Sequence, residues 1–137
     1  MKTFDYDFNG RTFHLAMNAN ALFDTYDKFG DKRSIAELPK GTGKKSFDAT
    51  CWMLAKFAEQ GELVRRYDGF KAEPIVTESY FRLQMKPLDV PGAKKALEQA
   101  IVLGFAREEE SAEEKDPYLA EYQKKTETDQ PALNICR

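Results

Sequence analysis

The dipeptide Asn9-Gly10 constrains the fold of this chain more than any other short segment. It separates two runs, 4–8 and 13–17, in which bulky apolar residues alternate with polar ones. Both central positions of a two-residue type I′ hairpin turn need positive φ, which asparagine and glycine adopt at little cost. The pattern therefore predicts an N-terminal β-hairpin that turns at Asn9 and Gly10.

The alternation also predicts the register of this hairpin, because a shift by one residue would move every apolar side chain to the other face. Four cross-strand pairs are expected. They are Phe4 with Leu15 and Tyr6 with Phe13 on the apolar face, and Asp5 with His14 and Asp7 with Thr12 on the opposite face.

Helical spacing of apolar residues follows the hairpin. The first expected helix runs to Phe29, with Asn18 or Asn20 as its cap and Gly30 as its stop. Residues 34–38 predict one or two further turns before a proline. The stretch 40–45, which is rich in glycine and lysine, predicts an exposed loop.

The most strongly patterned helix is expected to begin near Ser46, which would cap it. Its apolar face is wide, so this helix should form the centre of the core. Leu54, and Trp52 or Phe57, are expected to be buried there together with Leu97 of a later helix. Gly61 is expected to interrupt this helix, and a separate segment of one or two turns should follow over 62–67.

Two more helices are expected before residue 105. Thr77, Glu78 and Ser79 can cap a short helix that ends before Pro87. Asp89-Val90-Pro91 then opens the last helix, because proline is favoured in a first helical turn, and this helix should extend to Gly104. These elements define a mainly α fold with an N-terminal β-hairpin (α+β).

The composition changes after Phe105. Acidic residues outnumber basic ones and large apolar residues become sparse. We therefore expect two parts: a hairpin plus helical domain over 1–106, and a flexible acidic tail over 107–137 with at most one short helix near 117–125.

The composition also limits the function. The 42% of hydrophobic residues is enough for a packed core, but no run approaches the length of a membrane span, and residues 1–7 lack the apolar stretch of a signal peptide. The two cysteines, Cys51 and Cys136, lie far apart, so a cytoplasmic protein is expected. A net charge of -2 argues against nucleic acid as a partner.

No pattern in the sequence indicates catalysis, a metal or a cofactor. His14, the only histidine, is expected in a surface pair with Asp5, without a nucleophile beside it. One histidine and two distant cysteines do not make a zinc site. Cys51 fits a small core residue. We therefore expect a protein that is not an enzyme.

Two further motifs have a simpler structural interpretation. The stretch 41–46, GTGKKS, lacks the glycine spacing and the preceding strand of a phosphate loop, which favours a plain connector. Arg65 and Arg66 could contact a phosphate. In an acidic protein they are more simply explained by pairing with acidic neighbours or with the end of their own helix.

The order of the motifs along the chain resembles that of a known family. The segments concerned are FDYDFNGRTFHL (4–15), ALF (21–23), KFG (28–30), WML (52–54), AEQGE (58–62), RRYDG (65–69) and AIVLG (100–104). This succession, covering about residues 4–105, is similar to the tail assembly chaperones of long-tailed (siphovirus-type) bacteriophages and prophages of Gram-positive bacteria.

The resemblance implies a largely helical, non-catalytic protein that acts in the cytoplasm of the bacterial host and is absent from the mature virion. Its implied partners are the tape measure protein, which it keeps soluble, and the tail tube protein, which it helps to recruit. In many phages of this type a programmed frameshift also makes a longer form. Weak homo-oligomerisation is a further expectation.

An alternative is a small protein-binding adaptor, or an accessory domain of a host bacterial protein. Such an adaptor would be recruited through the hairpin. For the chaperone function, exposed apolar residues that the core does not need are the candidates for partner binding. Tyr80, Phe81 and Phe105 are the residues predicted for this role.

Overall fold

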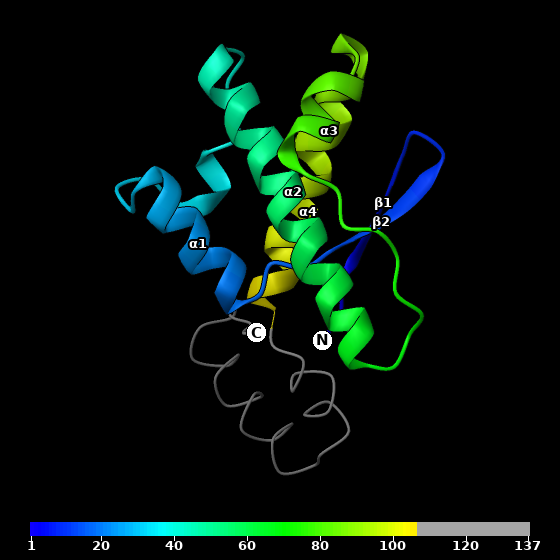
Figure 1. Cartoon of the computed structure of the whole chain (residues 1–137). Helices are drawn as coiled ribbons and strands as arrows, with labels where there is room; N and C mark the ends of the chain where they lie inside the picture. Colours follow the sequence, from blue (N-terminus) through cyan, green and yellow to red (C-terminus); the bar gives the residue numbers. More distant parts are fainter. Residues whose placement is uncertain (107–137) are drawn as a thin grey trace, which may run out of the picture. The chain divides into compact units, whose positions relative to one another are not determined.

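The structure, a computed structural model, describes residues 1–106; residues 107–137, with the predicted acidic tail and the short helix near 117–125, lie outside the described residues. Met1–Phe105 form one compact unit. The elements (Figure 1) are β1 (Phe4–Phe8), β2 (Arg11–Leu15), α1 (Ala19–Phe29), the 3-10 helix η1 (Ile35–Glu37), α2 (Lys44–Tyr67), α3 (Glu78–Gln84), the 3-10 helix η2 (Pro87–Asp89) and α4 (Val90–Phe105). The predicted mainly α fold with an N-terminal β-hairpin is confirmed.

The hairpin has the predicted turn and register. Asn9 and Gly10 both have positive φ, 54° and 79°. β1 and β2 pair antiparallel, and all four expected pairs are present, including Asp5 opposite His14. Phe13 and Leu15, on the apolar face of β2, are almost completely buried.

Helix α1 begins and ends as local signals predict. Asn18 is the N-cap, and its side-chain oxygen accepts a hydrogen bond from the backbone N–H of Ala21 at 2.9 Å. At the other end Gly30 has a φ of 86°, and its N–H donates to the carbonyl of Tyr26. The single turn of η1 lies where one or two turns were expected.

Two expectations for α2 are wrong. The helix begins at Lys44 with Gly43 as N-cap, so Ser46 does not cap it. Instead the hydroxyl of Ser46 is buried against the 3-10 turn, 3.1 Å from the carbonyl oxygen of Pro39. The helix is also continuous through Gly61, where an interruption was predicted. Gly61 is buried against β2, and its lack of a side chain permits that contact.

Helices α3 and α4 lie where they were expected. Thr77 precedes α3, although its side chain makes no capping hydrogen bond, and Pro91 lies in the first turn of α4. Gly104 lies within the last turn of α4 rather than after it. A Cβ at Gly104 would lie 2.3 Å from the carbonyl oxygen of Met17, so this glycine also permits a close contact.

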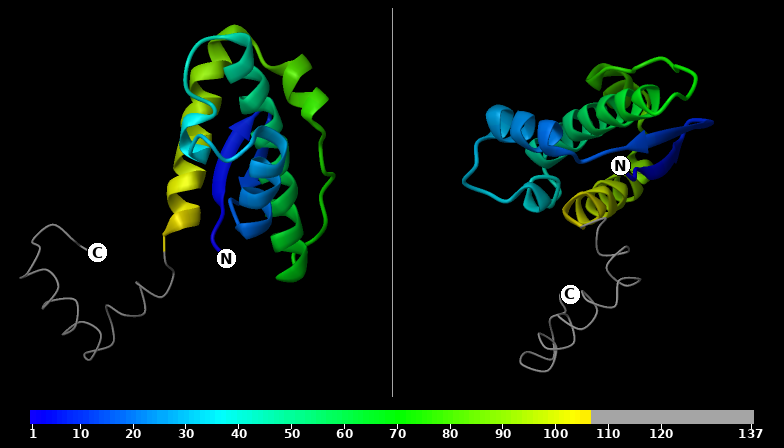
Figure 2. Two further views of the ribbon diagram at one scale, coloured as in Figure 1. Left: turned by 90° about the vertical axis from the view of Figure 1, so that its left-hand side faces the viewer. Right: turned by 90° about the horizontal axis from the view of Figure 1, so that it is seen from below.

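Helix α2 is the centre of the core. It contacts β2, α1, α3 and α4, and the hairpin lies between α2 and α4, with β2 against α2 and β1 against α4 (Figure 2). Leu54, Phe57 and Leu97 are fully buried in one cluster, which confirms the predicted core. Trp52 is only partly buried and lies at the edge of that cluster.

Candidate functional site

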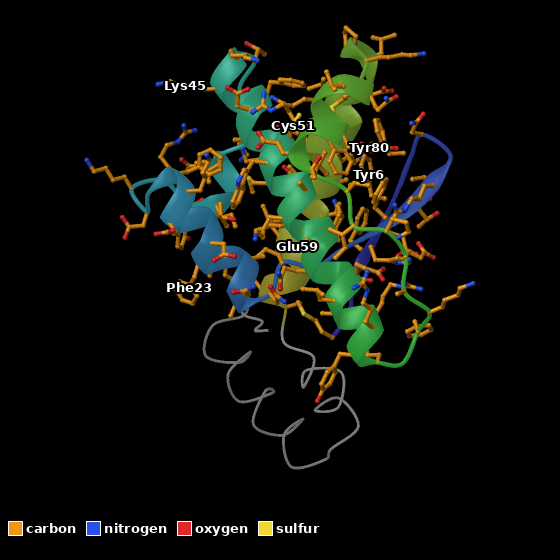
Figure 3. The ribbon with its side chains drawn as sticks, in the orientation of Figure 1. Tyr6, Phe23, Lys45, Cys51, Glu59 and Tyr80 are labelled. Atoms are coloured by element: carbon orange, nitrogen blue, oxygen red, sulfur yellow. The ribbon has the colours of Figure 1, made fainter. Side chains whose placement is uncertain are left out.

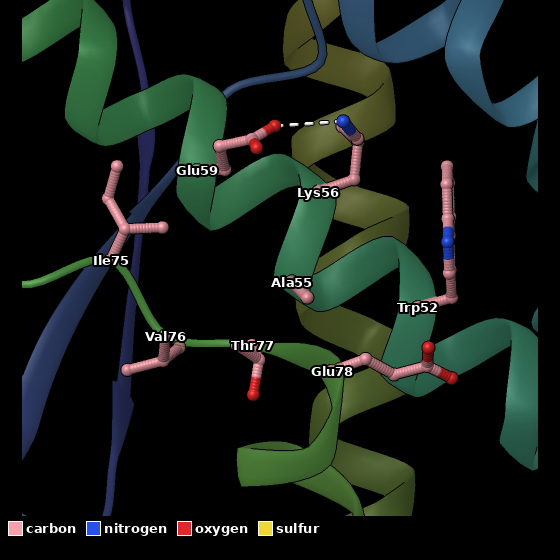
Figure 4. A pocket seen from close by; sticks show the side chains of 8 residues that line it. All are labelled: Trp52, Ala55, Lys56, Glu59, Ile75, Val76, Thr77 and Glu78. Carbon is pink, nitrogen blue, oxygen red and sulfur yellow. Dashed lines mark hydrogen bonds and ion pairs between the residues drawn. The ribbon is translucent and has the colours of Figure 1, made fainter.

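A groove of about 240 Å³ runs along the outer side of α2 (Figure 4). We call it the α2 groove. Its lining comes from two segments that are distant in the sequence: the middle of α2 and the extended chain that leads into α3. It is lined by Trp52, Ala55, Lys56, Glu59, Ile75, Val76, Thr77 and Glu78.

The floor of the α2 groove follows from helical geometry. Trp52, Ala55, Lys56 and Glu59 are spaced by three or four residues, so their side chains lie on one face of α2. The opposite face of the same helix supplies Leu54 and Phe57 to the core. Helix α2 therefore presents a second, mixed apolar and charged face that the rest of the described chain leaves partly uncovered.

Helix α1 supports one side of this floor. The ring of Phe29 packs edge-on against Trp52, with ring centroids 5.4 Å apart. The ammonium of Lys56 lies 3.1 Å from a carboxylate oxygen of Asp24 and 2.8 Å from one of Glu59. Burial lowers the pKa of Lys56, but these two hydrogen-bonded carboxylates outweigh it and raise the pKa above its usual value. The positive charge of Lys56 is thus paired within the protein.

The other wall is anchored by an ion cluster around the buried carboxylate of Glu62. Its carboxylate accepts hydrogen bonds from Arg65 at 2.8 Å, from Arg66 at 2.9 Å and from the backbone N–H of Glu73 at 2.7 Å. Burial raises the pKa of Glu62, but these donors together hold it below its usual value. Arg65 and Arg66 therefore pair with an acidic neighbour, as expected.

The hairpin also contributes to this wall. Arg11 donates a hydrogen bond to the carbonyl of Pro74 at 2.6 Å, and its guanidinium lies over the ring of Phe13. The segment just before Ile75 is consequently tied to both α2 and β2. These contacts hold Ile75 and Val76 in place along the groove, although they belong to no helix or strand.

The three predicted partner-binding residues differ in how exposed they are in the structure. Phe81 is fully buried, so its prediction as an exposed contact residue is wrong. Its ring packs against Phe8 and Phe13 beneath the hairpin, with centroids 5.7 and 5.3 Å apart. Tyr80 is partly buried, and its hydroxyl accepts a hydrogen bond from the side chain of Asn9. Phe105 is 59% exposed at the end of α4, outside the α2 groove.

The side chains considered as candidates for chemistry, His14 and Cys51, both make structural contacts. Nδ1 of His14 lies 2.9 Å from Asp5, which confirms the predicted cross-strand pair. Cys51 is buried in the core, and burial raises the pKa of its thiol to about 11. A thiol that stays protonated is a poor nucleophile. Among residues 1–106, no three His, Cys, Asp or Glu side chains are grouped to hold a metal ion.

The α2 groove was not predicted from the sequence. The sequence pattern predicts Trp52 or Phe57 to be buried in the core, and it indicates no role for Ile75 and Val76. The signal for them was weak: an apolar pair between Pro74 and the cap of α3, in a segment with no regular spacing. The position of this pair beside α2 depends on tertiary contacts, among them the hydrogen bond from the backbone N–H of Glu73 to Glu62.

Comparisons with known proteins identify no relative. No family model matches the chain, and neither the curated proteins nor the solved structures contain a match to it. Within residues 1–106, no helix combines the length and the apolar character needed to cross a membrane.

Proposed function

We propose that this protein is a non-catalytic phage tail assembly chaperone that binds the tape measure protein, keeps it soluble and helps to recruit tail tube protein. It would act in the cytoplasm of the bacterial host and leave before the virion is complete. The observation that carries the proposal is the α2 groove, together with the motif resemblance over residues 4–105.

The groove suits the recognition of a helix. An amphipathic helix binds by laying its apolar face into a groove with an apolar floor and polar edges. Trp52, Ala55 and Ile75 give the groove apolar surface, and Lys56, Glu59 and Glu78 give it charged groups. A tape measure helix exposes an apolar stripe until tube subunits surround it, and a chaperone that covers the stripe prevents aggregation.

The small size of the groove fits a transient role. At about 240 Å³ it accommodates only a few side chains, so each copy would bind weakly and many copies would bind along one filament. Differences in affinity between related interfaces lie mostly in the dissociation rate, so a weak contact dissociates quickly. Arriving tube protein can then displace the chaperone.

Co-expression tests the proposal. The chain is produced together with the tape measure protein of its own phage or prophage, and the soluble fraction of that protein is measured. The groove variant is Ile75→Glu, and the matched control is Leu63→Glu, since both side chains are exposed to a similar degree, 41% and 44%. We expect the wild type and the control to keep the tape measure protein soluble, and the groove variant to lose most of this effect.

A second variant, Phe105→Ser, tests the exposed residue predicted at the end of α4. If it alone abolishes solubilisation, the chaperone function stands and its surface lies at α4. If the tape measure protein never co-purifies with the folded wild type, the proposal fails and a protein-binding adaptor becomes the better interpretation.

A further inference from the structure

A second concave surface lies between the loop that precedes α2 and the first turns of α4. We call it the lysine cleft. Its larger part has a volume of about 430 Å³, and its apolar lining comes from Phe47, Pro87, Val90 and Pro91. A smaller hollow of about 240 Å³ continues it, sharing Pro91 and Lys94 and adding Lys40 and Lys95.

Lys94 shapes this cleft from within. Its ammonium donates hydrogen bonds to the carbonyl of Gly41 and to the hydroxyl of Ser46. It thereby ties α4 to the loop before α2, across more than forty residues of sequence. The two walls of the cleft are thus held by a specific contact, and the cleft does not depend on the loop alone.

The rim of the cleft is basic. Lys40 and Lys95 are exposed, and within the described residues neither of them lies in an ion pair. The ammonium of Lys44 lies over the ring of Phe47, but Lys44 is paired with Asp48 at 3.4 Å. Glu98 is the one carboxylate among the lining residues of the two hollows. Lys45, at the start of α2, lines neither hollow (Figure 3).

This charge is local and contrasts with that of the whole chain. The protein has a net charge of -2, yet lysines gather around this one apolar cleft. An apolar centre with a like-charged rim is complementary to a ligand with an apolar anchor and opposite charges beside it. The volume lies within the range of small sites, so it fits one or two bulky side chains of such a ligand.

We propose that the lysine cleft binds an acidic peptide segment of a partner protein, with a bulky apolar side chain seated against Phe47, Val90 and Pro91 and carboxylates beside Lys40 and Lys95. The α2 groove shares none of these residues. The inference therefore does not depend on the chaperone function, and either can hold without the other.

Binding of a synthetic peptide to the full-length chain tests this inference by fluorescence anisotropy. The probe is a short labelled peptide of glutamate and leucine residues. Two control peptides carry glutamine in place of glutamate or serine in place of leucine. We expect the parent peptide to bind more tightly than either control, and its affinity to fall as salt concentration rises, because exposed charges are screened.

Variants of the chain locate the binding. Lys40→Gln with Lys95→Gln should weaken binding by about fivefold, since exposed ion pairs are individually modest. Lys2→Gln with Lys71→Gln is the matched control, because it changes the net charge equally at exposed positions outside the cleft. Val90→Ser should also weaken binding by about fivefold through lost apolar contact. Serine is well tolerated at the start of a helix, so the fold should be kept.

Three results would overturn the inference. Equal loss of affinity in the two lysine double variants would show a response to net charge only. Equal binding of the parent and serine peptides would indicate a site for anions without an apolar anchor. The third result is that the chain self-associates and binds no peptide. If the Lys40→Gln and Lys95→Gln double variant abolished that self-association, the occupant of the cleft would be a second copy of the chain.

Discussion

The backbone carbonyl oxygen of His14 lies so close to Gly61 that a Cβ built on this glycine would be 1.6 Å from it. Strand β2 and helix α2 therefore meet with no side chain between them at this point. The contact explains why a glycine lies within a continuous helix of 24 residues. Glycine inside a helix is usually less favourable than alanine, but at this position we expect alanine to be the destabilising residue.

Gly61→Ala should destabilise the fold strongly. Helix propensity alone would make alanine more favourable by about 1 kcal/mol. The clash with the carbonyl of His14 must instead force β2 and α2 apart, which we expect to cost about 3 kcal/mol or more. Urea unfolding measures the difference. Gly92→Ala is the control: its Cβ would meet open space, so a gain of roughly 0.5–1 kcal/mol is expected. Equal effects of the two substitutions would contradict the close contact.

Leu54→Ala should lower the free energy of unfolding by about 2–5 kcal/mol. Leu54 is fully buried in the central cluster, and removing its side chain loses apolar burial and leaves a cavity. Leu83→Ala is the matched control, because Leu83 is 82% exposed and should change stability by less than about 0.5 kcal/mol. Chemical denaturation of both variants checks the prediction. A small effect at Leu54 would show that the core is loosely packed.

The Glu62 cluster predicts a pH dependence. Its hydrogen-bond donors hold the pKa of Glu62 below 4.5 in the folded state, so the unfolded state binds a proton first as the pH falls. The stabilisation is therefore fully present above the unfolded pKa near 4.5 and is lost as the pH falls through the lower folded value.

Glu62→Gln removes that dependence and provides the test. We expect the variant to lose about 1–3 kcal/mol at neutral pH, because a neutral amide pairs less well with Arg65 and Arg66. Between about pH 5 and 3, its stability should fall less than that of the wild type. Glu98→Gln is the exposed control. If the free energy of unfolding fell in parallel with pH for the wild type and Glu62→Gln, the Glu62 cluster would not be the cause of the pH dependence.

The thiol of Cys51 should be unreactive in the folded protein. A rise of its pKa from 9.0 to about 11 lowers the thiolate fraction at pH 8 about a hundredfold, and burial blocks access as well. The measurement is the rate of reaction with a disulfide reagent in a Cys136→Ser background, so that only Cys51 reports. Reaction should occur at the rate of unfolding. A fast reaction under native conditions would mean that the core opens readily.

Some features could be predicted from the sequence because short-range physics determines them. Positive φ at Asn9 and Gly10 defines the hairpin, and alternation with a period of two then defines its register. Asn18 and Gly30 similarly mark the ends of α1 through capping and a left-handed residue. Each of these signals acts within a few residues, so no knowledge of distant contacts is needed.

The sequence also determined that α2 belongs in the core, since its wide apolar face has to be covered. It did not determine which elements pack against the rest of α2. Whether Gly61 breaks a helix or permits a close approach depends on what lies opposite. Only the packing of β2 decided this, because the carbonyl of His14 occupies the space that a side chain would fill.

The candidate sites were decided almost entirely by tertiary structure. Phe81 and Phe105 look alike in the sequence, yet one is buried beneath the hairpin and the other is 59% exposed, because burial depends on which elements pack above each ring. In the same way, Ile75 and Trp52 line one groove because the segment before α3 packs along α2, where Glu62 holds the backbone N–H of Glu73. Helical and strand periods describe one element at a time, whereas a groove arises between elements that the chain brings together on folding.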